Sequence, residues 1–143
     1  MTVAAPVRPP EMKGEDEAAA MAAAAYFTEL FSYVVRTGDL DEWTQISGQT
    51  CKFCENTATH IDALYSGGGR VTGRTVDITS ERVVGVDEQL IVYSVLVSYD
   101  LAPGAEVDSS GVSPRPLTQE TGQIIMDVAP SVRGWILMGG DSQ

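Results

Sequence analysis

The chain has 143 residues, which is enough for one domain with a hydrophobic core of its own. Its formal net charge is -11, and its nine Lys and Arg residues form no cluster, which argues against nucleic acid or an anionic membrane surface as a partner. Residues 1–10 lack a basic start followed by a hydrophobic stretch, and we find no apolar run near the roughly 20 residues that a membrane span needs. Taken alone, these features favour a soluble, cytosolic protein.

We predict a disordered linker over residues 1–13, because prolines interrupt it and no periodic pattern is present, and a single domain over residues 14–140. A long helix is expected from near Glu15, where acidic residues suit the positive end of the helix dipole, to Gly38, a typical C-cap. Its apolar face has helical spacing and consists of Tyr26, Phe27, Leu30, Phe31, Val34 and Val35.

Two further helices are predicted before the chain changes character. Asp39 can cap a short one that runs through Trp43 and Ile46. The next should run from about Lys52 to Tyr65, and the glycines at 67–69 should stop it. Its expected core face is Phe53, Thr57, Ile61, Leu64 and Tyr65.

From residue 70 onward the pattern is that of strands. Separate short strands are expected around residues 76–78 and 82–86, and others at 117–128 and 132–138, with a loop at 102–116. Residues 89–101 are apolar on both alternating faces, which predicts a central strand covered on both sides. Helices followed by hairpin-linked strands indicate an α+β fold with N-terminal helices packed on a curved antiparallel sheet of four or more strands. This order is that of an NTF2-like or cystatin-like cone.

Cys51 and Cys54 are the only cysteines, and their C-x-x-C spacing leaves three interpretations open. A redox site would use the helix N-terminus to stabilise a thiolate, but a thioredoxin-like motif should follow a strand. A metal site would have only His60 as a further nearby ligand, and a structural zinc needs four. A structural disulfide is the interpretation that we prefer, and it would require an oxidising compartment.

Several short motifs in the first half of the chain occur together in one known family. They are Arg8-Pro9-Pro10, Ala25-Tyr26-Phe27, Thr37-Gly38-Asp39, Ser47 ahead of Cys51-x-x-Cys54, and Ile61, Leu64-Tyr65 and Gly67-Gly68-Gly69. Over roughly residues 6–75 the chain resembles an actinobacterial family of uncharacterised proteins, the domain of unknown function numbered 6318. The resemblance implies a lipoprotein, anchored outside the cytoplasm through a signal and linker that this sequence does not contain. It implies no activity.

The sequence contains no recognisable catalytic set, so we assign no catalytic residue, cofactor or metal. Candidates for a pocket inside the cone are Tyr26, Phe27, Tyr33, Trp43, Tyr93, Tyr99 and Asp100. We expect a non-catalytic extracytoplasmic domain that binds a protein partner or a small apolar ligand. The alternative is an NTF2-like enzyme of the isomerase, cyclase or dehydratase type that uses Tyr and Asp groups. Such sheets often pair through their exposed face, so a homodimer is a further expectation.

Overall fold

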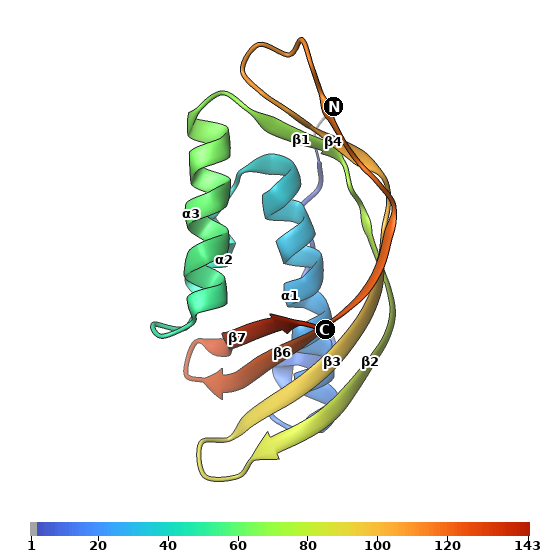
Figure 1. Cartoon of the computed structure of the whole chain (residues 1–143). Coiled ribbons are helices and arrows are strands. Elements are labelled where there is room, and N and C mark those ends of the chain that lie inside the picture. Colours follow the sequence, from blue (N-terminus) through green and yellow to red (C-terminus); the bar gives the residue numbers. More distant parts are fainter. Residues whose placement is uncertain (1–2) are drawn as a thin grey trace.

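The computed structural model describes residues 3–143 and has helices first and strands second (Figure 1). A 3-10 turn, η1, at Pro10–Lys13 precedes the helices α1 (Glu17–Thr37), α2 (Asp41–Ile46) and α3 (Lys52–Ser66). The strands are β1 (Arg70–Gly73), β2 (Val76–Asp87), β3 (Val92–Leu101), β4 (Gly104–Val107), β5 (Arg115–Leu117), β6 (Glu120–Ser131) and β7 (Gly134–Ser142). The predicted α+β class, with helices before an antiparallel sheet, is confirmed.

The strands form two antiparallel sheets that are two parts of one bent surface. The smaller sheet has the order β1-β4-β5, and the larger has the order β2-β3-β6-β7. β1 passes into β2, β3 into β4, and β5 into β6 through the two-residue corners 74–75, 102–103 and 118–119. Figure 1 shows these strands curving from one sheet into the other around the helices. The bend therefore lies at three corners stacked side by side.

Helix α1 fills the concave side of this surface. Its N-terminus is capped by Asp16, whose Oδ1 accepts a hydrogen bond from the Ala19 N–H at 2.9 Å. It ends at Gly38, whose φ of +73° is a left-handed conformation that glycine adopts without steric cost. A Cβ at Gly38 would also lie 2.6 Å from the ring of Tyr65. Both predicted ends are thus confirmed to within two residues.

The composition of α1 suits a core helix that packs closely on a sheet. Its buried residues are Ala19, Ala20, Ala23, Ala24, Tyr26, Phe27, Thr28, Leu30, Ser32 and Val34. By length and hydropathy α1 could also cross a membrane, so the prediction that no segment reaches that length is wrong on this measure. Because 56% of its most apolar window is buried in the fold, this property is what a core helix would show as well.

Strand β3 is central, as predicted, but only one of its faces is fully covered. Val95 and Val97 face α1 and are completely buried. On the outer face Ser94 and Ser98 donate and accept hydrogen bonds across to β6, and Leu96 is half-buried. The expectation of cover on both sides is therefore wrong, because the helices all pack on the concave face. The strand also starts at Val92, since Ile91 has a φ of +53° in the preceding turn.

The two short strands expected over 76–78 and 82–86 are one strand, β2, which carries two bulges. Bulges at 78–80 and 83–85 let the strand continue along β3 while its register shifts. Likewise, the last strand starts at Gly134 rather than Val132 and runs on to Ser142, beyond the predicted domain end at 140.

The end of the predicted linker is folded onto the body. Met12 is 7% exposed, and its carbonyl and that of Gly14 both accept hydrogen bonds from the Trp135 indole N–H, at 3.0 and 3.1 Å. Arg8 adds an ion pair with Glu42. We call residues 8–14 the strap. The prediction of disorder through residue 13 fails here because a buried indole N–H needs an acceptor, and Met12 supplies apolar area beside it.

Candidate ligand-binding cavity

The two cysteines form a disulfide at the start of α3. Their Cα atoms are 5.2 Å apart, and both residues are buried. Cys51 also caps the helix, because its Sγ accepts the Cys54 N–H at 3.0 Å. The carbonyl of Cys54 accepts the indole N–H of Trp43 at 3.1 Å, which connects α3 to α2. The disulfide of the structural interpretation therefore closes the first turn of α3, and the hydrogen bond from Trp43 links this turn to α2.

Phe53 lies between the two cysteines and forms half of a stacked aromatic pair. Its ring is nearly parallel to that of Phe31 on α1, with centroids 5.7 Å apart and planes at 19°. Trp43 meets both rings edge-on at about 6 Å. On the sheet side Phe53 lies against Gly140, where a Cβ would come within 2.7 Å of the ring. We call Phe31 and Phe53 the aromatic pair.

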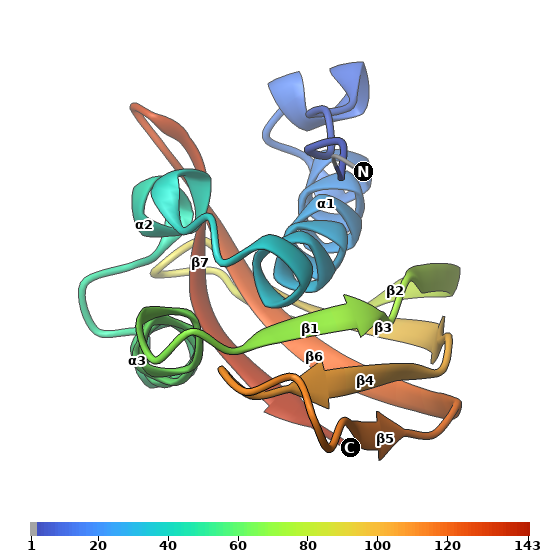
Figure 2. The same ribbon diagram turned by 90° about the horizontal axis from the view of Figure 1, so that it is seen from above.

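Three hollows that share Phe31 lie beside the aromatic pair, between α1, α3 and both sheets, and we refer to them together as the cavity. They are an apolar recess of about 80 Å³ that ends at Tyr99, and two larger hollows of about 350 and 510 Å³ that share Val35, His60 and Ile61. Phe31 borders all three. Figure 2 looks onto this end of the molecule, where α1, α3 and β1 are grouped. The remaining apolar lining includes Leu64, Val71, Val76, Leu101, Leu117, Ile124 and Met126.

Tyr99, like Ser32, is a polar residue that lines both the recess and one hollow. Its hydroxyl lies over Gly122, where a Cβ would be 2.8 Å from the oxygen. Within residues 3–143 the hydroxyl has no hydrogen-bond partner, and no fully buried side-chain polar atom is left without one, so it faces accessible space. Burial and the charge of Glu120 raise the pKa of Tyr99, against an opposing effect of Arg74. The hydroxyl therefore stays protonated at neutral pH and is available as a donor.

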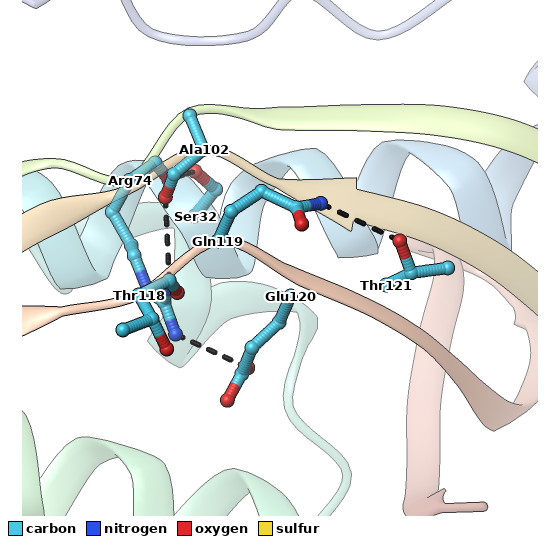
Figure 3. Close-up of polar contacts among 7 residues, drawn as sticks. All are labelled: Ser32, Arg74, Ala102, Thr118, Gln119, Glu120 and Thr121. Carbon is cyan, nitrogen blue, oxygen red and sulfur yellow. Dashed lines mark hydrogen bonds and ion pairs between the residues drawn. The ribbon is translucent and has the colours of Figure 1, made fainter.

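Arg74 holds the three sheet corners together beside this cavity (Figure 3). Its side chain is only 13% exposed; Nη1 donates to the carbonyls of Ala102 and Thr118, and Nη2 pairs with Glu120 at 3.1 Å. Its own carbonyl accepts the Ser32 hydroxyl of α1 at 3.1 Å. Arg74 has a φ of +66°, uncommon for a residue with a Cβ. This conformation is maintained by bonds to three separate segments: α1 and the corners at 102–103 and 118–120.

The charges around the cavity are paired within the protein. The pairs are Arg74 with Glu120, Arg115 with Glu106, and Lys52 with Glu55. His60 is exposed on α3 at the border between the two larger hollows. Apolar walls with paired rim charges suit an apolar guest better than an ion.

Of the seven predicted pocket residues, Tyr99 alone lines this cavity. Phe27 and Trp43 are fully buried core residues. The hydroxyl of Tyr26 donates to Glu42 at 2.6 Å, beneath the Arg8 guanidinium of the strap. Burial and Glu42 raise the pKa of Tyr26 to about 12, and Arg8 opposes this shift.

The other three lie elsewhere on the molecule. The Tyr33 hydroxyl donates to Asp39 at 2.9 Å at the surface. Tyr93 packs edge-on against Trp135, and its hydroxyl donates to the Glu15 carbonyl at 3.3 Å. Asp100 accepts a hydrogen bond from Thr121 across the outer face of the sheet. These six side chains do not form one pocket.

The cavity roles of Phe31, Phe53 and Arg74 were not predicted from the sequence. The two phenylalanines were expected only as core residues, although the position of Phe53 inside the cysteine pair marks it as a side chain that the disulfide would hold. Arg74 has no local signal, because its partners are 28 to 46 residues away in the sequence.

Fold and cavity define a class: an α+β domain in which a bent antiparallel sheet encloses a core helix and leaves one apolar cavity open. The chain belongs to the Family of unknown function (DUF6318), whose model matches residues 2–138. No curated protein matches the chain. Among solved structures, the intermembrane space region of the chloroplast protein ARC6 is similar with a TM-score of 0.68 at 11% identity, over 89% of this chain and 95% of that one. At this identity the likeness concerns the fold.

Proposed function

We propose that the chain is a non-catalytic binding module whose cavity receives a small apolar ligand or an apolar part of a protein partner. The observation that carries this proposal is the apolar cavity around the aromatic pair, whose rim charges are already paired. An unfilled apolar surface of this kind is costly in water unless a guest covers it.

The proposal includes an NTF2-like cone. Its support is the order of helices and strands and the bent sheet that encloses α1. In such a cone the open end is the natural place for a ligand, because the opposite end is filled by side chains. Here the cavity adjoins the C-terminal half of α1, through Phe31 and Val35.

The proposal also places the domain outside the cytoplasm as an actinobacterial lipoprotein. Its support is the buried disulfide, which would be reduced in a cytosolic environment, together with the family membership. Thiol titration of protein isolated from its native source should find both sulfurs oxidised. Two free thiols would contradict the extracytoplasmic location.

One observation favours the alternative of an enzyme: the unpartnered Tyr99 hydroxyl at the wall of the cavity. A general acid needs further groups to act on a substrate, and the nearest ionisable ones, Arg74 and Glu120, are bound to each other. A binding role therefore agrees better with the site.

The test of the binding role is titration with N-phenyl-1-naphthylamine, an uncharged dye that fluoresces in apolar surroundings. Wild-type protein should bind the dye at micromolar concentration. Val35→Trp, which fills the cavity from α1, should reduce the affinity at least tenfold. The matched control is Val84→Trp on β2, where the side chain is 45% exposed and outside the cavity. Equal binding by both variants would mean that the dye binds elsewhere, and no binding by the wild type would refute the proposed function.

A further inference from the structure

If the proposed binding function holds, the lining of the cavity limits the charge that a ligand can carry. A charged ligand group inside the cavity would need an opposite charge or several donors to replace its water. Arg74 is already bound to Glu120 and two backbone carbonyls, and Arg115 is bound to Glu106. Lys52, which borders the largest hollow, is 84% exposed and lies 3.6 Å from Glu55, so its charge stays in water at the entrance. Among the described residues, the inner wall thus offers a buried ion no free counter-charge.

Four hydroxyl groups line the recess, and that of Ser142 belongs to an exposed residue near the C-terminus. Thr28 and Ser32 also line the recess, but their hydroxyls already donate to the carbonyls of Ala24 and Arg74. The Tyr99 hydroxyl has no such acceptor in residues 3–143. A guest that contacts the inner wall therefore satisfies Tyr99 best by presenting a hydrogen-bond acceptor.

The shape of the cavity limits the ligand as well. The recess at Tyr99 is too small for more than a narrow group, whereas the two hollows that share Phe31 with it are several times larger. Phe31 lines every part, and together the parts extend from Tyr99 on the sheet to Lys52 and His60 on α3. A guest that occupies the whole cavity must be long and must lie against the aromatic pair.

We propose that the ligand is an uncharged, elongated apolar molecule with one hydrogen-bond acceptor, such as an ester or ketone oxygen, which the Tyr99 hydroxyl binds while the apolar part lies along Phe31 and Phe53. Tyr99 is then the residue that distinguishes an acceptor-bearing molecule from a plain hydrocarbon. Because the rim charges are paired with each other, an uncharged molecule should bind more tightly than its ionised counterpart.

The experiment is displacement of bound N-phenyl-1-naphthylamine by four molecules of equal chain length: methyl decanoate, decane, decanoate and decyltrimethylammonium. On wild-type protein, methyl decanoate should displace the dye at a concentration at least tenfold below that of decanoate and of the ammonium compound. Tyr99→Phe should weaken methyl decanoate roughly three- to tenfold, the range of one hydrogen bond, and leave decane unchanged.

A second variant tests Tyr99 without altering it. Gly122→Ala would place a methyl group 2.8 Å from the Tyr99 hydroxyl, so the ring must move and methyl decanoate should weaken as it does in Tyr99→Phe. The control is Gly139→Ala in the neighbouring strand β7, where the nearest atom would lie at an ordinary 3.4 Å.

The outcomes separate the two proposals. If the dye does not bind the wild-type protein, the binding function itself is wrong. If the dye binds and Val35→Trp abolishes it, but decanoate competes as well as its methyl ester, the uncharged-ligand inference alone is wrong. If Tyr99→Phe weakens decane and the ester equally, Tyr99 is part of the wall and does not bind an acceptor.

Discussion

Tyr93 and Tyr99 point from the same strand toward the same side, yet they lie in opposite surroundings. Tyr93 is packed against Trp135 with centroids 5.8 Å apart, and its hydroxyl donates to the Glu15 carbonyl. Tyr99 contacts the cavity, and no group of residues 3–143 binds its hydroxyl. We refer to the surroundings of Tyr93 as the closed end and to those of Tyr99 as the open end.

The difference arises from what the rest of the chain brings to each end. At the closed end the strap adds Met12 and two backbone carbonyls that bind the Trp135 indole. At the open end no comparable segment among the described residues enters, and the disulfide keeps Phe53 on Phe31. The strand pattern is the same at both ends, so distant segments decide whether a tyrosine is structural or free to bind.

The largest effect is expected at the closed end. Trp135→Ala should lower the free energy of unfolding by about 3–5 kcal/mol, because it removes a buried indole and leaves the Met12 and Gly14 carbonyls without their donor. Chemical denaturation measures this. The control Val132→Ala, at a fully exposed neighbouring position, should change it by less than about 0.5 kcal/mol. A loss below about 1 kcal/mol for Trp135→Ala would show that the strap is not bound there in solution.

The next effect concerns the open end. Replacing both Cys51 and Cys54 with Ser should destabilise the protein by about 2 kcal/mol, since a short loop removes little chain entropy. It should also weaken binding of N-phenyl-1-naphthylamine, because Phe53 is no longer held by a crosslink on both sides. Denaturation and dye titration at a temperature where the variant is folded measure the two effects separately. Unchanged dye affinity would show that α1 and Gly140 alone hold the aromatic pair.

A third prediction concerns how the free energy of unfolding depends on pH through Tyr26, which lies beneath the strap. The pKa of Tyr26 is raised from 10 to about 12, so its contribution to stability is complete below pH 10 and is lost as the pH rises to 12. The wild type should lose roughly 1–2 kcal/mol more than Tyr26→Phe over this range, allowing for solvent screening. Denaturation at pH 9, 10, 11 and 12 gives the comparison. Parallel pH profiles would contradict the Tyr26–Glu42 hydrogen bond.

The smallest expected effect is the difference in stability between Tyr93→Phe and Tyr99→Phe. Tyr93→Phe removes a long hydrogen bond to Glu15 and should cost about 0.5 kcal/mol, whereas Tyr99→Phe removes none within the described chain and should cost nothing. Dye displacement by methyl decanoate should respond in the opposite way, changing only in Tyr99→Phe. A stability loss in Tyr99→Phe would show that its hydroxyl has a partner in the protein.

The features that the sequence predicts correctly depend on nearby residues. The Gly38 cap, the start of α3 at the cysteines and the inner face of β3 are each decided within one turn or one strand. The failures involve partners far apart in the sequence. Met12 contacts Trp135, which lies 123 positions further along the chain. Phe53, on α3, contacts Gly140 in the last strand. Apolar periodicity identified the aromatic residues but could not tell which of them the fold would leave uncovered.

Arg74 affects how widely the cavity can open. One guanidinium binds carbonyls and a carboxylate from two other corners, so it adds to the backbone hydrogen bonds that hold the small sheet at its angle to the large one. Lysine could not reproduce this, because an ammonium lacks the planar fork. A relative with a smaller residue at this position could open to a bulkier guest while α1 and its alanines stay as they are.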